Sequence, residues 1–176
     1  MSYYQFYQPF SGVVRHLIIL NVLMFFGTYA ILGSEVVNDT TYRYESLGRM
    51  VLAAYMPGSE HYQPFQLVTY MFMHGDFGHL LFNMLGLYFF GPMVEMAWGH
   101  SKFLFYYLFC GIGAWALHMG VQWWELEQLG FDPTLWNGAM LGASGAIFGV
   151  YVAFGFTFPN QVVQLLFPPI PLKAKY

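Results

Sequence analysis

Three polar side chains interrupt strongly apolar stretches of the sequence. Ser144 opens one stretch, in the run Gly142-Ala143-Ser144-Gly145. His79 and Asn83 lie one helical turn apart at the start of another stretch. Hydroxyl, imidazole and carboxamide groups are unfavourable inside a membrane, so ionisable and polar residues there usually mark a functional site. The three residues therefore predict a reaction site within a bilayer.

The chemistry that these groups favour is nucleophilic attack by serine. A residue in the first turn of a helix lies among unpaired backbone N–H groups at the positive end of the helix dipole, which favours negative charge. An oxyanion formed by attack of Ser144 on an amide would find donors in the Ser144 N–H, the Asn83 carboxamide and the His79 ring. Losing one such donor typically costs about 3 to 4 kcal/mol of transition-state stabilisation. Gly142 and its small neighbours would allow a tight turn and close approach of a peptide.

Each of these residues also has a structural interpretation. Gly145 and Gly149 form a G-x-x-x-G pair, which in membrane helices is most often a packing surface. Taken alone, a serine there is more often a packing or capping residue, a histidine near the interface a hydrogen-bonding residue, and a buried asparagine a link between helices. The catalytic interpretation depends on Ser144, His79 and Asn83 reaching the same depth.

The composition predicts an integral membrane protein. Hydrophobic residues make up 57% of the 176 residues and charged residues only 9%, too few to cover the surface of a soluble domain. Charged residues divide the chain into apolar stretches approaching the roughly 20 residues needed to cross a bilayer as a helix. We expect four spans, at Leu17–Leu32, Leu80–Val94, Phe103–Gln122 and Ser144–Phe158.

The distribution of basic residues predicts the orientation of these spans. Lys and Arg accumulate in cytoplasmic segments. Here most of them precede the first span, separate the second from the third, or follow the fourth: Arg15, Lys102, Lys173 and Lys175. We therefore expect a multi-pass protein of the bacterial inner membrane with a cytoplasmic N-terminus. In that orientation His79, Asn83 and Ser144 enter the bilayer from its outer face.

The outer loop from Ser34 to Gly78 is long enough to carry structure of its own. Apolar residues recur at helical spacing from Leu47 to Tyr55, which predicts a short amphipathic helix in the outer interface. This helix either covers the bundle or gates the access of a substrate. A second short helix is expected between Pro64 and Met73. No repeat or linker divides the chain, so we expect a single domain over residues 1–176.

The sequence resembles the rhomboid intramembrane serine proteases. The resemblance rests on His74-Gly-Asp-Phe-Gly-His79-Leu-Leu-Phe-Asn83, on Gly142-Ala-Ser144-Gly-Ala-Ile-Phe-Gly149, and on the long outer loop. It implies an all-α bundle of six membrane helices, of which four are present here. It also implies cleavage of transmembrane segments of other proteins near the outer membrane face, without cofactor or metal. The implied partners are membrane helices and the bilayer, not nucleic acid.

The resemblance also implies roles for individual residues. Ser144 matches the nucleophile, His79 and Asn83 match the pair that stabilises the oxyanion, and Gly142 matches the glycine before the nucleophile. Phe148 lies where many members carry a tyrosine that packs on the catalytic histidine, so it is a candidate for packing beside bound substrate.

Two departures from the family pattern concern stabilisation of the fold. Glu95 lies where members often have an acid followed two positions later by arginine, but here Ala97 takes that place. Phe65 and Gln66 replace the Trp-Arg pair that some members carry in the outer loop. These differences bear on how the loop is stabilised and not on the chemistry.

A third departure concerns the chemistry. Rhomboid proteases use a histidine on the sixth helix as general base, and a serine hydroxyl is a poor nucleophile without one. None of the remaining histidines fits this role by position: His16, His61, His74, His100 and His118. We therefore expect residues 1–176 to be C-terminally incomplete as a rhomboid domain and not to hydrolyse peptides by themselves.

Two other functions remain open from the sequence. A non-catalytic rhomboid-like protein that binds membrane helices would keep the bundle and tolerate loss of the base. A small channel or transporter using His79 as an ion site is the weaker alternative, because such sites lie near the midplane and use broken helices or acids. Labelling of Ser144 by a fluorophosphonate distinguishes a protease from both.

Overall fold

The structure is a computed structural model that describes residues 12–31, 35–36, 45–164 and 171–174. Its long helices are α1 Gly12–Ile31, α4 Phe77–Trp98, α5 His100–Gln128 and α6 Ser144–Thr157. The shorter helical segments are α2 Leu47–Leu52, α3 Gln66–Thr69, η2 Tyr70–Phe72 and η3 Pro133–Leu135. Two antiparallel strand pairs join β1 Glu35–Val36 to β2 Glu45–Ser46, and β3 Val162–Gln164 to β4 Pro171–Lys173.

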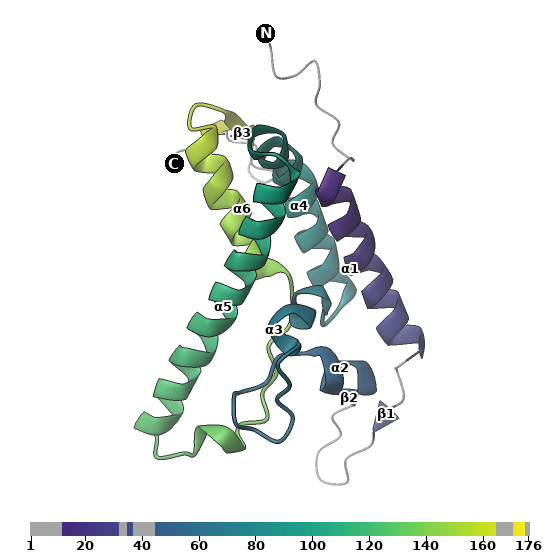
Figure 1. Cartoon of the computed structure of the whole chain (residues 1–176), viewed down its shortest axis with the longest axis vertical. Coiled ribbons are helices and arrows are strands. Elements are labelled where there is room, and N and C mark those ends of the chain that lie inside the picture. The colour runs from purple at the N-terminus through teal and green to yellow at the C-terminus, as the bar shows by residue number, and fades with distance from the viewer. Residues whose placement is uncertain (1–11, 32–34, 37–44, 165–170, 175–176) are drawn as a thin grey trace.

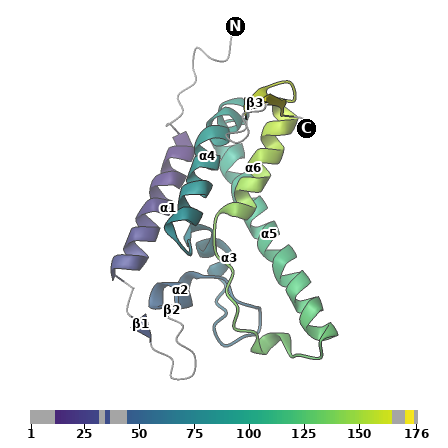
Figure 2. The ribbon, with the colours of Figure 1, turned by 180° about the vertical axis from the view of Figure 1, so that it is seen from behind.

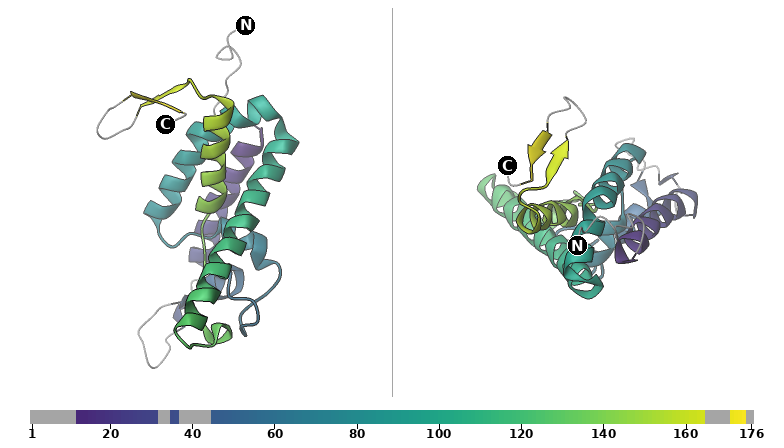
Figure 3. Two further views of the ribbon diagram at one scale, coloured as in Figure 1. Left: turned by 90° about the vertical axis from the view of Figure 1, so that its left-hand side faces the viewer. Right: turned by 90° about the horizontal axis from the view of Figure 1, so that it is seen from above.

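The long helices lie close together at one end of the molecule, and α1 and α5 diverge toward the other end (Figure 1). α4 packs between α1 and α6, and α6 packs in turn against α5. Figure 2 shows α6 from the other side, descending between α4 and α5. The end view in Figure 3 shows β3 and β4 projecting away from these helices. A helical bundle is what apolar stretches of this length require, because a helix satisfies its own backbone hydrogen bonds in lipid.

Each of the four predicted spans coincides with one long helix, although the bounds differ. α1 begins at Gly12 instead of Leu17, and α5 continues to Gln128, beyond the expected end at Gln122. Among the described residues, α4 and α5 are long and apolar enough to cross a membrane by length and composition, while Gly12–Thr28 and Ser144–Thr157 are shorter apolar helices. The helical architecture is as predicted, and the number of spans stays a prediction.

The two ends of the bundle carry different elements. The start of α1, the α4–α5 connection and β3 lie at one end, and α2, β2 and the far end of α5 lie toward the other (Figure 1). The elements that carry Arg15, Lys102 and Lys173 are therefore gathered at one end. We call this the inner end and the opposite one the outer end. Lys175 lies outside the described residues.

The predicted amphipathic helix at Leu47–Tyr55 is wrong in its length and in its surroundings. α2 ends at Leu52, and the residues that follow are fully or almost fully buried, so they do not lie on an interface. Ala54 instead pairs with Met140 in an antiparallel bridge, with N–H to carbonyl distances of 2.9 and 2.8 Å. These backbone hydrogen bonds to a distant segment compete with continuation of the helix. The second predicted helix is present as α3 followed by η2.

A buried glutamine holds the outer loop. The Gln66 side chain donates to the carbonyls of His61 and Val51, at 2.9 and 3.1 Å, and accepts from the N–H of Gln63 at 3.0 Å. Thr69 on the same helix donates to the carbonyl of Leu52 at 2.8 Å. Gln66 thus joins three parts of the loop at the position where some rhomboids carry arginine.

A buried carboxylate holds the inner end. Glu95 on α4 is only 4% exposed and accepts hydrogen bonds from the N–H groups of Val13 and Val14, at 2.5 and 3.1 Å. Its other partner is the His100 ring, with Nδ1 2.5 Å from the carboxylate. Glu95 therefore caps the N-terminus of α1, where a negative charge is favoured. This cap explains why α1 begins earlier than its apolar residues predict.

Candidate active site

The structure brings Ser144, His79 and Asn83 together. All three line one cavity of about 300 Å³ between α4 and α6. Its other lining residues are apolar or aromatic: Phe82, Ile147, Phe148 and Tyr151. A mostly apolar cavity with a few convergent polar groups is the usual form of a site that binds and orients another molecule.

Local hydrogen bonds at the start of α4 position the imidazole and the carboxamide. The Asp76 carboxylate caps the helix by accepting from the backbone N–H of His79 at 2.8 Å. This cap places His79 in the first turn of α4. One turn later, the Asn83 amide group donates to the carbonyl of His79 at 3.0 Å, which restrains the carboxamide. The helix thus holds the Asn83 side chain directly, whereas the Asp76 cap fixes the backbone from which the His79 ring projects.

On the α6 side, a glycine makes the turn that leads to the serine. Gly142 has a φ of +116°, a conformation that L side chains rarely adopt, and its N–H donates to the carbonyl of Tyr70 at 2.9 Å. A Cβ atom at this position would lie 2.7 Å from Nε2 of His79 and 3.8 Å from Oγ of Ser144. Gly142 therefore allows both the turn and the close approach of the imidazole.

Close packing against α5 fixes the position of α6. A side chain at Gly145 would overlap Ala114, and one at Gly149 would overlap Cys110. The Tyr106 hydroxyl on α5 donates to the carbonyl of Gly149 at 3.0 Å. The G-x-x-x-G pair is therefore a packing surface, while Ser144 beside it lines the cavity. The packing interpretation therefore applies to Gly145 and Gly149, and the catalytic interpretation to Ser144.

Phe148 lies at the edge of the cavity. Its side chain is 66% exposed, and its ring makes an edge contact with Tyr151, with ring centroids 5.8 Å apart. The ring that contacts His79 in the described structure belongs to His74. Packing of Phe148 beside a bound substrate stays a prediction.

His74 is more closely involved than the sequence indicates. It is 8% exposed, its ring centroid lies 5.0 Å from that of His79, and neither of its ring nitrogens hydrogen-bonds to a described residue. Burial, and secondarily the neighbouring His79, lower the pKa of His74 to about 4, although the Phe72 carbonyl and the Asp76 carboxylate oppose this shift. His74 is therefore a neutral ring that packs against the candidate oxyanion residue.

The other histidines lie elsewhere. His16 accompanies the start of α1 and His100 contacts Glu95, both at the inner end. His61 lies 3.4 Å from Glu60 in the outer loop, and His118 faces Trp136. Among the described residues, His79 is therefore the one histidine that lines the cavity. Within that same part of the chain, no group of three His, Cys, Asp or Glu side chains is suited to hold a metal ion.

Comparison with known proteins shows which family the chain resembles. The family model of the Rhomboid domain matches residues 61–174. Rhomboid protein 1, mitochondrial, of Saccharomyces cerevisiae is 31% identical over 146 residues, covering 81% of this chain and 40% of that protein. Rhomboid protease AarA of Providencia stuartii is 38% identical over 85 residues, covering 47% and 30%. Rhomboid-like protein 11, chloroplastic, of Arabidopsis thaliana is 37% identical over 87 residues, covering 49% and 27%. These matches span less than half of each relative.

Proposed function

Because this chain belongs to the rhomboid family, we propose that it supplies the nucleophile and the oxyanion-binding groups of an intramembrane serine endopeptidase. The observation that supports this most is that Ser144, His79 and Asn83 line one cavity, with the turn at Gly142 leading into Ser144. Relatives named as rhomboid proteases agree with a proteolytic function. The substrates are transmembrane segments of other membrane proteins.

In the proposed reaction, the Ser144 hydroxyl oxygen attacks the carbonyl carbon of a peptide bond and its proton passes to a general base. The carbonyl oxygen becomes an oxyanion, which the Ser144 N–H, the Asn83 carboxamide and a ring N–H of His79 stabilise. Collapse of this intermediate breaks the C–N bond, and the leaving amine takes the proton back from the base. Water then attacks the acyl group on Ser144, and the serine regains its proton as the acid leaves.

Among the described residues that line the cavity, none is suited to act as the general base. His79 is the histidine lining the cavity within the described residues, and an imidazole that donates to the oxyanion is not free to act as the base. We therefore propose that the base comes from a histidine outside residues 1–176, on a further helix packed beside the cavity. Residues 1–176 alone then hydrolyse no peptide bond.

The site lies toward the outer end of α4 and α6, since His79 and Ser144 are in the first turns of these helices. The basic residues at the inner end support a cytoplasmic N-terminus, because such residues accumulate in cytoplasmic segments. Cleavage would then occur near the outer face of the bilayer. A bacterial inner membrane suits this arrangement.

Reconstitution with a transmembrane substrate tests the proposal. We compare residues 1–176, a form extended to carry a histidine on a sixth helix, and Ser144→Ala in each. We expect cleavage and fluorophosphonate labelling only in the extended form with Ser144 intact. Cleavage by residues 1–176 would contradict the argument about the base. Binding of the substrate helix by the extended form without labelling or cleavage would favour the non-catalytic alternative.

A further inference from the structure

Tyr70 connects the turn before Ser144 to α5. It is fully buried in η2, and its backbone carbonyl accepts the hydrogen bond from the N–H of Gly142 at 2.9 Å. Its hydroxyl donates to the carbonyl of Gly111 on α5 at 2.7 Å. One residue therefore links the outer loop, a membrane helix and the turn that leads to the nucleophile.

The bond to Gly142 acts at the most constrained point of the candidate active site. Gly142 has positive φ and lies so close to His79 that even a Cβ atom would clash with the imidazole. A change in the direction of this peptide would alter the position of the Ser144 N–H relative to His79. The Tyr70 carbonyl therefore restrains the turn that precedes Ser144, although Tyr70 does not line the cavity.

Two further hydrogen bonds restrain Tyr70: its carbonyl also accepts from the N–H of Met73 at 3.1 Å, and its hydroxyl ties the side chain to α5. Gly111 accepts its hydrogen bond close to the point where α5 meets α6, since Ala114, one turn further along, packs against Gly145. The side chain of Met71 packs against Gly111, which is buried. η2 and α6 consequently both contact the same part of α5.

We propose that Tyr70 is a positioning residue that holds the Gly142 turn, and with it the Ser144 N–H, in register with α5. This inference rests on the proposed function of Ser144, and it adds a residue that the catalytic motifs do not include. Tyr70 neither contacts the reacting atoms nor exchanges a proton with them. Its effect is to pre-orient the Ser144 N–H, since electrostatic stabilisation of a transition state depends on pre-oriented donors.

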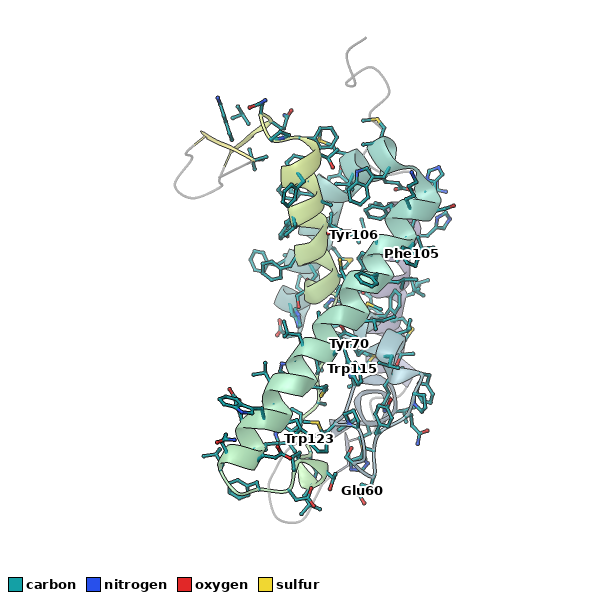
Figure 4. The ribbon with its side chains drawn as sticks, turned by 60° about the vertical axis from the view of Figure 1, so that its left-hand side comes forward. Glu60, Tyr70, Phe105, Tyr106, Trp115 and Trp123 are labelled. Atoms are coloured by element: carbon teal, nitrogen blue, oxygen red, sulfur yellow. The ribbon has the colours of Figure 1, made fainter. Side chains whose placement is uncertain are left out.

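Tyr106 provides a matched control. Its hydroxyl also donates from one element to a glycine carbonyl on another, to Gly149 at 3.0 Å, but it holds the middle of α6 and not the turn before Ser144. Figure 4 shows the two tyrosines at different levels along α5, with Tyr106 nearer to the end of α6 that carries β3. Tyr70→Phe and Tyr106→Phe therefore each remove one hydroxyl of the same kind.

Hydrogen exchange on residues 1–176 tests the positioning role without requiring activity. We expect Tyr70→Phe to accelerate amide exchange in the segment 138–146 about tenfold, the effect of losing one buried hydrogen bond, with α5 remaining protected. Tyr106→Phe should leave this segment unchanged within about twofold. Equal exchange in this segment for the two variants, or a uniform increase along the whole chain in Tyr70→Phe, would overturn the proposal.

Labelling of Ser144 by a fluorophosphonate in the extended form then tests the consequence for chemistry. We expect the labelling rate of folded Tyr70→Phe to fall about tenfold, and that of Tyr106→Phe to stay within about twofold of the wild type. Equal losses in both variants would show that the hydroxyl supports only the fold. If the wild-type protein is not labelled, the proposed function is wrong, and the exchange result still decides whether Tyr70 holds the turn.

Discussion

The outer and inner ends of the bundle are held by different kinds of hydrogen bond. At the outer end, neutral side chains of Gln66 and Thr69 bind backbone groups of the loop. At the inner end, the buried carboxylate of Glu95 binds two backbone N–H groups of α1 and the His100 ring. Both anchors lie where the chain departs from the family pattern, at Gln66 in place of arginine and near Ala97.

The two ends thus show how backbone groups can be held by a carboxylate or by neutral side chains. A neutral amide keeps its hydrogen bonds at any pH, and loss of one partner leaves a dipole unpaired. A buried carboxylate makes stronger hydrogen bonds, but removing it leaves several groups without a partner. The inner anchor should therefore be the more sensitive of the two to substitution.

Substitution Glu95→Ala should have the largest effect. It leaves the N–H groups of Val13 and Val14 without their acceptor, which together costs about 4 kcal/mol of unfolding free energy, and it also removes the partner of the exposed His100 ring. Reversible unfolding in mixed detergent measures this loss. The control is Glu60→Ala, because the Glu60 side chain is 78% exposed. An equal loss in the two variants would refute the assigned role of Glu95.

The outer end has its own pH-sensitive group in His74. Because the pKa of His74 is lowered from 6.5 to about 4, the unfolded state binds more protons between these values. Stability from this group is thus fully present above pH 6.5 and declines as the pH falls toward 4, by about 3 kcal/mol in total. We expect the wild type to lose this amount relative to His74→Gln in the same detergent. Parallel stability curves for the two proteins would contradict the burial of a neutral ring.

Substitution Gln66→Leu should destabilise the outer loop by about 2 kcal/mol, because it leaves two carbonyls and one N–H without their partner. Gln63→Leu is the matched control, since Gln63 is exposed and contributes its backbone N–H to this network. Limited proteolysis of the loop and thermal unfolding report the difference. Similar behaviour of the two leucine variants would show that the Gln66 network adds nothing to stability.

Substitution His100→Ala should have the smallest effect of the series, about 1 kcal/mol. The His100 side chain is 72% exposed, so solvent competes for its interaction with Glu95, whereas the two N–H groups of α1 remain bound to the carboxylate. Thermal unfolding of this variant beside His16→Ala, at the same end, measures the contribution. A loss as large as that of Glu95→Ala would mean that the ring, and not the α1 cap, is the main partner.

Prediction from the sequence succeeded where the signal is local. An apolar stretch that begins at Ser144 predicts a helix from that residue, and α6 begins there. The spacing of His79 and Asn83 places both on one face of α4, and both line the cavity. The extent of α2 was predicted incorrectly, since Ala54 pairs with Met140, a residue far along the chain. Periodicity within a segment carries no information about such a distant partner.

The sequence by itself determined that this chain forms apolar helices and that a serine, a histidine and an asparagine stand at the starts of two of them. Only the tertiary structure decided that Glu95 caps α1, that His74 is buried against His79, and that Tyr70 ties the Gly142 turn to α5. The reason is physical: helix formation depends on neighbours within a few residues, whereas burial and hydrogen-bond partners depend on which helices pack together.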